Sequence, residues 1–417
     1  MKIYFLTQYF PPETGAPQNR LYELALQLQQ KGDEVVVLTA MPNYPDMKIK
    51  KGYRWRLWKT ETINGLKIYR SAIFVTRARF VLARLLNYFS FVFTSFWLGL
   101  FKIKKGDFIF CESPPLFLGI TARALSKLKK IDMIFNVSDL WPESAEKLGI
   151  VTNKRFLNMA TRLEEHLYKR SALISGQTMG IVNNIRERFP KKKVIWVPNG
   201  VNTDEIISMK TDKQKWRKKM DFAPDDFLFF YGGILGYAQG LEVILKTADK
   251  LRNEEHIKFV ILGDGPEKES LMLIADHLEL DNVFFLDSVS RETIPEIISA
   301  IDVSIIPLRK IELFKGAIPS KIFESLALEK PILLGVEGEA HDLFIKDGNC
   351  GLFFEPENAQ SLTDAARQIM SEPDLSSKLG ENGLKYVREY FERSKIATKF
   401  RQDLIEFKSG NNDTEST

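Results

Sequence analysis

The residues of this sequence best suited to chemistry lie in the segment GAIPSKIFESLALEKPILLG, residues 316–335. Pro319 and Ser320 are typical of a helix start, with Ser320 or a neighbour as the cap. Lys321 would then lie in the first turn, where the helix dipole disfavours a cation unless an anion neutralises it. Glu324 would follow on the same helix face. The pattern predicts that Lys321 binds a diphosphate and Glu324 accepts hydrogen bonds from a ribose; the alternative is a capped helix with a Lys–Glu pair.

Three glycine-containing turns are further candidates for phosphate binding. Gly15 precedes a helical segment, and Gly233 follows an apolar run in YGGILGYAQG. Gly263 and Gly265 lie in the turn GDGP after another apolar run. Glycine allows an anion to approach backbone amides closely at the start of a helix. Each turn also fits a purely structural loop, and the first one lacks the G-x-G-x-x-G pattern of dinucleotide-binding proteins.

The segment SDLWPES, residues 138–144, offers groups that could hold an acceptor. Asp139 could bind or polarise a hydroxyl group, and Trp141 has a flat face for a sugar ring. The alternative is a capping aspartate and a tryptophan that packs in the core. The chain contains no D-x-D triplet, the carboxylate pair that usually holds a metal–diphosphate. We therefore expect phosphate handling without a metal or other cofactor.

Alternating strand-like and helical segments must position these residues. Short apolar runs predict strands that are covered on both faces. Their alternation with helical patterns predicts an α/β fold with two doubly wound parallel sheets, each in a Rossmann-like domain, and two such sheet edges facing each other would form a cleft. Ligands of such sheets bind at the carboxyl ends of the strands, where the candidate residues lie. The predicted strands are 2–6, 34–38, 107–111, 133–137, 172–175, 193–197, 227–231, 258–262, 282–286, 302–306, 331–335 and 351–354.

The polar stretch between Val201 and Phe227 marks the domain boundary. We predict an N-terminal domain over residues 1–205 and a C-terminal domain over residues 206–384. An amphipathic helix is expected over residues 385–408. The remaining residues, 409–417, are polar and predicted to be disordered.

The composition excludes several classes of protein. Of the 417 residues, 44% are hydrophobic and 27% charged, as in ordinary globular chains and unlike disordered, collagen-like or coiled-coil ones. The two cysteines, Cys111 and Cys350, exclude a disulfide scaffold and a cysteine-based zinc site and suit a reducing cytosol. The apolar run before Pro11 is too short for a secretory signal and instead predicts the first buried strand.

Residues 47–106 form an intensely basic zone in an otherwise mildly acidic chain. They contain fourteen Lys and Arg residues and a single acid, Glu61. Tyr88 to Phe101 carries no charge but is shorter than the roughly 20 residues that span a bilayer. The pattern favours a helix lying against an anionic membrane surface over a buried core helix or a nucleic-acid site. The expected membrane contacts are Arg77, Arg79, Arg84, Phe96, Trp97, Lys102 and Lys104.

Several segments together resemble family 4 of the glycosyltransferases, which has the GT-B fold. They are YFPPETGAPQNRLYELALQLQQKGDEVVVLTAMPNYP, SDLWPES, VPNGVN, GDGP and PSKIFESLALEKPIL, and the resemblance covers essentially the whole chain. The most similar group looks like the bacterial transferases that build O-antigen or capsule repeats, including N-acetyl-L-fucosamine transferases. The resemblance implies retaining transfer from a nucleotide sugar, most often UDP-linked. The C-terminal domain would hold this donor, the N-terminal domain the acceptor, and the final helix would pack back on the N-terminal domain.

The resemblance also assigns residues, with some departures from the family pattern. Glu324 matches the second carboxylate of the E-x7-E motif and would bind ribose, while the first carboxylate is replaced by Gly316. The usual Arg and Lys of the donor loop are Ile234 and Gln239 here. Lys321, helix amides and Arg291 would then supply the positive field, and the donor sugar would be deoxy or N-acetylated. The remaining expected donor contacts are Gly15, Gly233, Gly263, Gly265, Pro319 and Ser320, and the acceptor contacts are Arg20, Asp139 and Trp141.

We therefore expect an enzyme that transfers sugar from a UDP-sugar to a polyprenyl-diphosphate-linked saccharide at the inner face of the cytoplasmic membrane. Lys321 and backbone amides would stabilise the leaving UDP, and Asp139 would align the acceptor. Nucleotide-sugar epimerases and sugar phosphorylases share the expected architecture and remain alternatives. A non-catalytic, membrane-associated binding protein on a decayed transferase scaffold is a third, because Gly316, Ile234 and Gln239 depart from the family pattern.

Overall fold

The computed structural model describes residues 1–13, 15–44, 47–76, 81–149 and 151–415. The chain divides into two compact units: the first comprises Met1–Asn199 with Arg393–Thr417, and the second Gly200–Glu392. The chain thus leaves the first unit after Asn199 and re-enters it at Arg393, not at residues 205 and 385 as expected. The physical reason is local pairing, because the Val201 amide donates to the Phe391 carbonyl at 3.0 Å and ties both crossings into the second unit.

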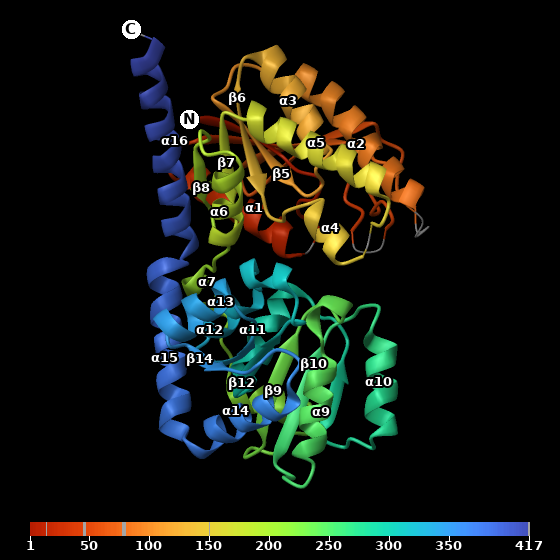
Figure 1. Ribbon diagram of the computed structural model, residues 1–417, viewed down its shortest axis with the longest axis vertical. Helices are drawn as coiled ribbons and strands as arrows, with labels where there is room; N and C mark the ends of the chain where they lie inside the picture. Colours follow the sequence, from red (N-terminus) through yellow and green to blue (C-terminus); the bar gives the residue numbers. More distant parts are fainter. Residues whose placement is uncertain (14, 45–46, 77–80, 150, 416–417) are drawn as a thin grey trace. The chain divides into compact units, whose positions relative to one another are not determined.

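The first unit is built on an eight-stranded sheet with the order β3-β4-β2-β1-β5-β6-β7-β8. Figure 1 labels β5 to β8 of this sheet. All neighbours are parallel except β3 and β4. The strands are β1 (Lys2–Leu6), β2 (Glu34–Ala40), β3 (Trp58–Ile63), β4 (Leu66–Ser71), β5 (Phe108–Ser113), β6 (Asp132–Val137), β7 (Leu173–Gly176) and β8 (Val194–Trp196). The helices are α1 (Ala16–Gln30), α2 (Val81–Lys102), α3 (Leu118–Lys129), α4 (Glu143–Lys147), α5 (Lys154–Arg170), α6 (Met179–Arg188) and α16 (Arg393–Glu415).

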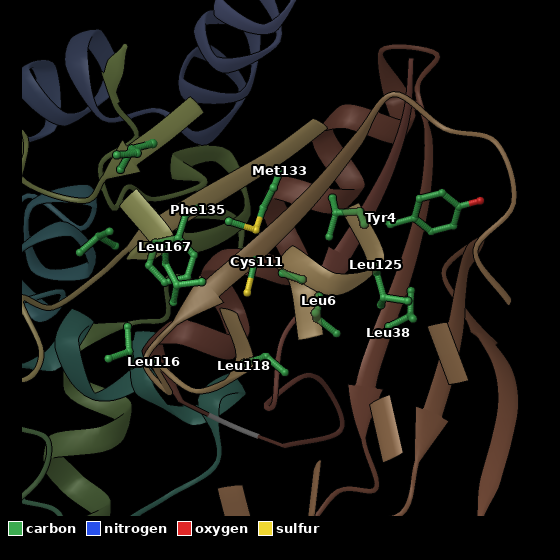
Figure 2. Packing of buried hydrophobic residues seen from close by; sticks show 14 of the residues in the cluster. Tyr4, Leu6, Leu38, Cys111, Leu116, Leu118, Leu125, Met133, Phe135 and Leu167 are labelled. Atoms are coloured by element: carbon green, nitrogen blue, oxygen red, sulfur yellow. The ribbon is translucent and has the colours of Figure 1, made fainter. Parts of the chain in front are cut away.

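Hydrophobic clusters cover both faces of this sheet. On one face, strand residues such as Leu6, Cys111 and Phe135 pack against Leu125 of α3 and Leu167 of α5 (Figure 2). On the other face, α1 and α16 supply the cover. Burial on both faces explains why these strands are nearly all apolar in sequence.

The hairpin of β3 and β4 was not predicted from the sequence. Its two-residue turn is Asn64-Gly65, and both residues have positive φ, +47° and +82°. This dipeptide is the strongest short-range signal for such a turn, since both positions need left-handed backbone. The signal was present in ETINGLKIY but lies within the stretch that we interpreted only as a basic surface zone.

The second unit contains a six-stranded parallel sheet with the order β11-β10-β9-β12-β13-β14. The strands are β9 (Phe227–Gly232), β10 (Ile257–Leu262), β11 (Val283–Leu286), β12 (Val303–Pro307), β13 (Ile332–Gly335) and β14 (Gly351–Phe353). The α-helices are α7 (Thr203–Ser208), α8 (Lys213–Lys219), α9 (Glu242–Lys250), α10 (Lys268–His277), α11 (Ile294–Ala300), α12 (Lys321–Ala327), α13 (Glu339–His341), α14 (Ala359–Ser371) and α15 (Pro373–Tyr390). Short 3-10 segments follow three strands: η1 (Tyr237–Gln239), η2 (Arg291–Thr293) and η3 (Glu312–Gly316).

The last helix, α16, packs on α1 within the first unit. Arg401 bonds to Asp33 at 2.8 Å, and the rings of Phe400 and Phe110 lie 5.6 Å apart. Residues 385–390, which we expected in this helix, instead form the end of α15. Residues 409–415 continue α16 where we expected a disordered tail, since extending a helix gains one hydrogen bond for each residue fixed. No helix within the described residues is long and apolar enough to cross a membrane.

Candidate functional site

The second unit has a topological switch point at its first strand. β9 lies between β10 and β12. The crossover that follows β9 leads to one side of this strand, and the crossover that follows β11 leads to its other side. Open parallel sheets bind ligands in the crevice at such a point. The loops that follow β9 and β10, and helix α12 after β12, carry the residues that the sequence predicted for donor binding.

The loops after β9 and β10 pack backbone against backbone. A β-carbon on Gly263 would lie 1.8 Å from the Gly233 carbonyl oxygen, and one on Gly265 would lie 2.2 Å from the Leu235 carbonyl oxygen. Gly233, Gly263 and Gly265 have φ values of +147°, +149° and +158°. Only glycine accommodates both this approach and this backbone conformation. The three glycines named from sequence are therefore brought together where the two loops meet.

Lys321 joins this glycine cluster from the start of α12. Its ammonium lies 3.6 Å from the centre of the Tyr231 ring, and a β-carbon on Gly233 would lie 3.0 Å from Lys321 Nζ. Burial lowers the pKa of Lys321 to about 7. Within the described residues Lys321 forms no salt bridge. A half-buried, uncompensated cation beside exposed backbone can bind an anion.

The other residues of the PSKIFE segment lie at the start of α12. Glu324 is half-buried in the first turn of α12, and Pro319 is half-buried just before the helix. Ser320 holds the N-cap position, but its side chain makes no capping hydrogen bond, because its backbone is already helical with φ −63° and ψ −24°. Ser320 is thus the N-cap residue, as one of the two expected possibilities, but it caps the helix without a side-chain hydrogen bond. Its hydroxyl is exposed instead.

Arg291 opens η2 after β11, at the same sheet edge. Two strands, β10 and β9, separate β11 from β12, which precedes Lys321. β11 pairs directly with β10, so the loop that carries Arg291 is the neighbour of the loop that carries Gly263 and Gly265. A donor-binding role for Arg291 stays a prediction.

Tyr231 is a site residue that sequence reasoning missed. It is the last fully buried residue of β9, and its hydroxyl donates to the Ile234 carbonyl at 2.7 Å. The available signal was a hydroxyl-bearing residue at the end of the apolar run FLFFY, directly before two glycines. Arg309, after β12, was also not predicted. It stacks 3.9 Å from the Tyr237 ring and is paired with Glu357 at 3.3 Å, so its charge is compensated.

In the first unit, Arg20 belongs to a buried polar network. Its Nη2 donates to Glu112 Oε1 at 2.6 Å and to Ser138 Oγ at 2.8 Å. Asn136 donates to the other Glu112 oxygen at 2.6 Å, and Ser175 donates to Asn136 at 2.7 Å. The network joins α1 to β5, β6 and β7. The guanidinium predicted to contact an acceptor is thus held by a carboxylate, and its acceptor role stays a prediction.

Asp139 and Trp141 have local partners. Asp139 Oδ2 accepts from Ser144 Oγ at 2.8 Å, and burial raises the pKa of this carboxyl. The Trp141 ring meets Phe117 and Phe156 edge to face, with centroids 5.6 and 6.2 Å apart. The ring contacts fit the alternative of a packing tryptophan, whereas Asp139 does not cap α4, whose N-cap residue is Pro142. An acceptor role for either residue stays a prediction.

The start of α1 and the loops beside it carry further polar groups. Gly15 caps α1 with extended backbone, and a β-carbon there would lie 2.5 Å from Gln18 Oε1. The side-chain oxygens of Gln8, Gln18 and Asn43 are buried without a hydrogen-bond partner among the described residues. Glu13 accepts from the Asn43 and Tyr44 amides at 2.7 and 2.8 Å. Sequence reasoning named Gly15 but missed the four polar side chains, since single amide or carboxylate side chains carry no distinctive spacing.

Helix α2 presents an apolar stripe to solvent. Leu86, Phe89, Phe93, Trp97 and Phe101 follow one another at helical spacing and are all exposed, Phe93 and Phe101 by 64% and 65%. The opposite side of the helix buries other residues in the core.

The predicted membrane contacts are distributed unevenly on this surface. Arg84, Trp97, Lys102 and Lys104 are exposed as expected. Phe96 is only half-buried and packs against the core cluster, so it lies beside the stripe and not on it. Its position in the helix turns it about 100° away from Trp97. Arg77 and Arg79 lie outside the described residues.

A second exposed aromatic segment adjoins α2. Trp55, Leu57 and Trp58 are exposed by 101%, 71% and 59%. The Leu57 carbonyl accepts from the Ala72 amide at 2.8 Å, and Thr94 of α2 donates to the Ala72 carbonyl at 2.5 Å. This segment therefore lies next to the middle of α2.

Not every basic residue of this zone lies at the surface. Arg70 is fully buried, and its Nε donates to Glu61 at 2.5 Å. For metals, no group of three or more His, Cys, Asp or Glu side chains that could hold an ion occurs in the part of the chain that the structure describes. The expectation of metal independence stays a prediction.

Comparison with known proteins places the chain in a family. The family described as Glycosyltransferase Family 4 matches residues 18–205, and the family described as Glycosyl transferases group 1 matches residues 212–386. The chain is 25% identical over 413 residues to the putative colanic acid biosynthesis glycosyl transferase WcaI of Escherichia coli, covering 97% of this chain and 100% of that protein. It is 22% identical to the lipopolysaccharide core biosynthesis glycosyltransferase LpsE of Rhizobium meliloti, covering 73% of this chain and 85% of LpsE.

The fold agrees with these matches. The crystal structure of HepE from Anabaena in complex with UDP-glucose superimposes with a TM-score of 0.72 at 15% identity, covering 97% of this chain and 100% of that one. At this identity the likeness concerns the fold. The family matches and the two parallel-sheet units together identify the chain as a glycosyltransferase of family 4 with the GT-B fold.

Proposed function

We propose that this glycosyltransferase moves a sugar, with retention of configuration, from a UDP-sugar to a lipid-linked saccharide in the assembly of a bacterial surface polysaccharide. The single observation that carries the proposal is the uncompensated Lys321 ammonium beside the Gly233–Gly263 backbone at the switch point of the second unit. The names of WcaI and LpsE support the polysaccharide class, and the UDP-glucose complex of HepE supports a uridine nucleotide sugar.

The proposed chemistry assigns a task to each donor residue. Lys321 and the backbone amides near Gly233 stabilise negative charge on the leaving diphosphate, as an oxyanion hole does. Glu324 accepts hydrogen bonds from the ribose. The bond from the sugar's anomeric carbon to the diphosphate oxygen breaks, and a bond to the acceptor hydroxyl oxygen forms on the same face. The hydroxyl proton passes to the departing phosphate, so the step balances without a metal or other cofactor.

The acceptor side of the proposal concerns the first unit. Asp139 aligns the acceptor hydroxyl, with Arg20 and Trp141 near the acceptor saccharide. The apolar stripe of α2, flanked by Arg84, Lys102 and Lys104, holds the enzyme on an anionic membrane surface, where a lipid-linked substrate is found. Exposed aromatic and basic side chains together are typical of such interfacial helices.

A panel of nucleotide sugars tests the proposal. Purified enzyme is incubated with each donor and with lipid-linked saccharide extracts in vesicles, and products are identified by mass spectrometry. We expect transfer from a UDP-sugar and little from other nucleotides. Donor conversion without an acceptor would indicate an epimerase, and the absence of both binding and turnover would favour the decayed scaffold.

The turnover of two lysine variants tests the donor role of Lys321 directly. Lys321→Met should lower turnover about 10²-fold or more, since one electrostatic donor to the leaving group is lost. Lys330→Met is the matched control. Lys330 also has a pKa lowered by burial, to about 8, but it precedes β13 at the opposite sheet edge. Equal activity of the two variants would contradict the donor role of Lys321.

A further inference from the structure

We infer that Tyr231 is a positioning residue, which holds the Lys321 ammonium at the phosphate site without neutralising it. The inference rests on the proposed function and deepens it. Three observations carry it: the 3.6 Å contact between the ammonium and the ring, the hydrogen bond that fixes the ring, and the absence of a salt bridge to Lys321 among the described residues.

The Tyr231 ring is fixed at both ends. Its backbone belongs to β9, where Tyr231 pairs with Ile261 of β10. Its hydroxyl donates to the Ile234 carbonyl at 2.7 Å, in the loop that follows β9. The ring therefore spans from the strand to the glycine loop. Lys321 comes from α12 and lies over the face of this ring, so its long side chain is directed toward Gly233.

An aromatic face and a carboxylate would have different effects on this ammonium. A carboxylate at salt-bridge distance would cancel the charge that a diphosphate needs. The negative face of a ring attracts the ammonium by about 0.5–2 kcal/mol and leaves its net charge unchanged. Burial raises the pKa of the Tyr231 phenol, so this hydroxyl stays neutral and does not become a competing anion. Tyr231 is a titratable side chain in direct contact with Lys321, and Glu324 lies in the same first turn of α12.

The same sheet edge offers a contrasting pair. Arg309 lies over the Tyr237 ring at 3.9 Å, but Glu357 and Glu267 lie within salt-bridge distance of Arg309. Its charge is therefore already balanced. The donor loop carries Ile234 and Gln239 where the resemblance implies two cations. Lys321 over Tyr231, in contrast to Arg309, retains its positive charge for a ligand.

Two variants of Tyr231 separate the ring from its hydroxyl. Tyr231→Phe keeps the ring face and loses the bond to Ile234, whereas Tyr231→Leu keeps an apolar side chain and loses the ring face. The first measurement is the pKa of Lys321 in the free protein, followed by NMR after isotopic methylation of lysines. We expect the pKa to fall in Tyr231→Leu, because the ring favours the charged form, and to stay near the wild-type value in Tyr231→Phe.

The second measurement is calorimetric binding of UDP and of uridine. Tyr231→Leu should weaken UDP binding about 2- to 30-fold, the range that corresponds to a cation–π contact. Uridine binding should not change, because uridine lacks the diphosphate. In a Lys321→Met background, Tyr231→Leu should have little further effect on UDP binding. Tyr237→Leu is the matched control for the pKa measurement, since its ring holds Arg309 and not Lys321.

The outcomes distinguish this inference from the proposed function. An unchanged Lys321 pKa in Tyr231→Leu would overturn the inference, as would equal losses of UDP and uridine binding. If the wild-type protein binds no UDP, the proposed function fails, and the Lys321 pKa in the two variants still decides whether Tyr231 holds the ammonium.

Discussion

A β-carbon on Gly263 would lie 1.8 Å from the carbonyl oxygen of Gly233, so the two loops at the switch point touch through their backbones. Because the obstructing atom belongs to the backbone, it cannot turn aside as a flexible side chain would. The position of Gly233, next to Lys321, therefore depends on the absence of a side chain at Gly263.

Gly263→Ala should accordingly destabilise the second unit and weaken UDP binding. The positive φ of +149° adds strain of about 1–3 kcal/mol to the steric overlap. Gly236→Ala, in the neighbouring loop after β9, is the control, because Gly236 has φ −135° and its β-carbon would meet nothing closer than 3.3 Å. Chemical denaturation and UDP calorimetry measure both effects. Similar stability and affinity for the two variants would contradict the proposed packing role.

Binding of UDP should be accompanied by proton uptake at pH 8. With its pKa lowered to about 7, Lys321 is mostly neutral in the free protein at this pH. A bound diphosphate favours the ammonium and raises this pKa, so a proton is taken from the buffer. UDP itself is already ionised at pH 8, since a terminal phosphate has a second pKa near 6. Calorimetry in two buffers of different ionisation enthalpy gives the proton count, which should vanish in Lys321→Met.

Arg20→Met should destabilise the first unit by about 3–5 kcal/mol, because it leaves the buried Glu112 carboxylate without its cation. The double variant Arg20→Met with Glu112→Leu should recover much of this loss, since it removes both charges. Urea denaturation measures the two free energies of unfolding. A rise in the acceptor KM at unchanged stability would instead support the predicted acceptor role of Arg20.

Asp139→Asn should become more stable relative to the wild type as the pH rises from 4 to 7. Burial raises the pKa of Asp139 above 3.8, so the native state binds its proton more tightly than the unfolded state does. The wild type therefore loses stability as the pH rises through the native pKa, whereas the amide does not titrate. The amide oxygen can still accept from Ser144. Thermal melts of both proteins across this pH range test the sign of the difference.

Each strand expected from a continuous apolar run is present, and central strands such as β1 and β10 are buried on both faces. β3 differs, since its side chains alternate between half-buried and exposed at the edge of the sheet. Edge strands lack the continuous apolar signal, and here the Asn64-Gly65 turn was the available evidence. The glycine cluster and Lys321 could be placed because the fold rule fixes which loops meet at the carboxyl ends of strands.

Contacts between segments that are far apart in the sequence could not be predicted in the same way. Arg20 and Glu112 belong to α1 and β5, and nothing in their spacing indicates that they form a salt bridge at 2.6 Å. Tyr231 and Lys321 are similarly separated along the chain. A basic residue near an apolar run also looks the same whether it is exposed like Lys102 or buried like Arg70, because burial depends on the tertiary structure.

The exposed stripe of α2 should bind vesicles that contain anionic lipids. Phe93→Ser with Trp97→Ser removes two large exposed side chains and should reduce co-sedimentation at least tenfold. Its thermal stability should be nearly unchanged, because neither residue lies in the core. The matched control is the double variant Leu128→Ser with Met159→Ser. It removes exposed apolar side chains from α3 and α5 instead of α2.

Charge should contribute to the same binding in a salt-dependent manner. Lys102→Glu with Lys104→Glu should weaken vesicle binding strongly at low salt and less at high salt, because about 0.15 M salt screens exposed charges beyond roughly 8 Å. The remaining high-salt binding should still depend on Phe93 and Trp97. Binding that is insensitive to both the aromatic and the lysine variants would mean that α2 does not face the membrane, and the lipid-linked acceptor would then need another route to the enzyme.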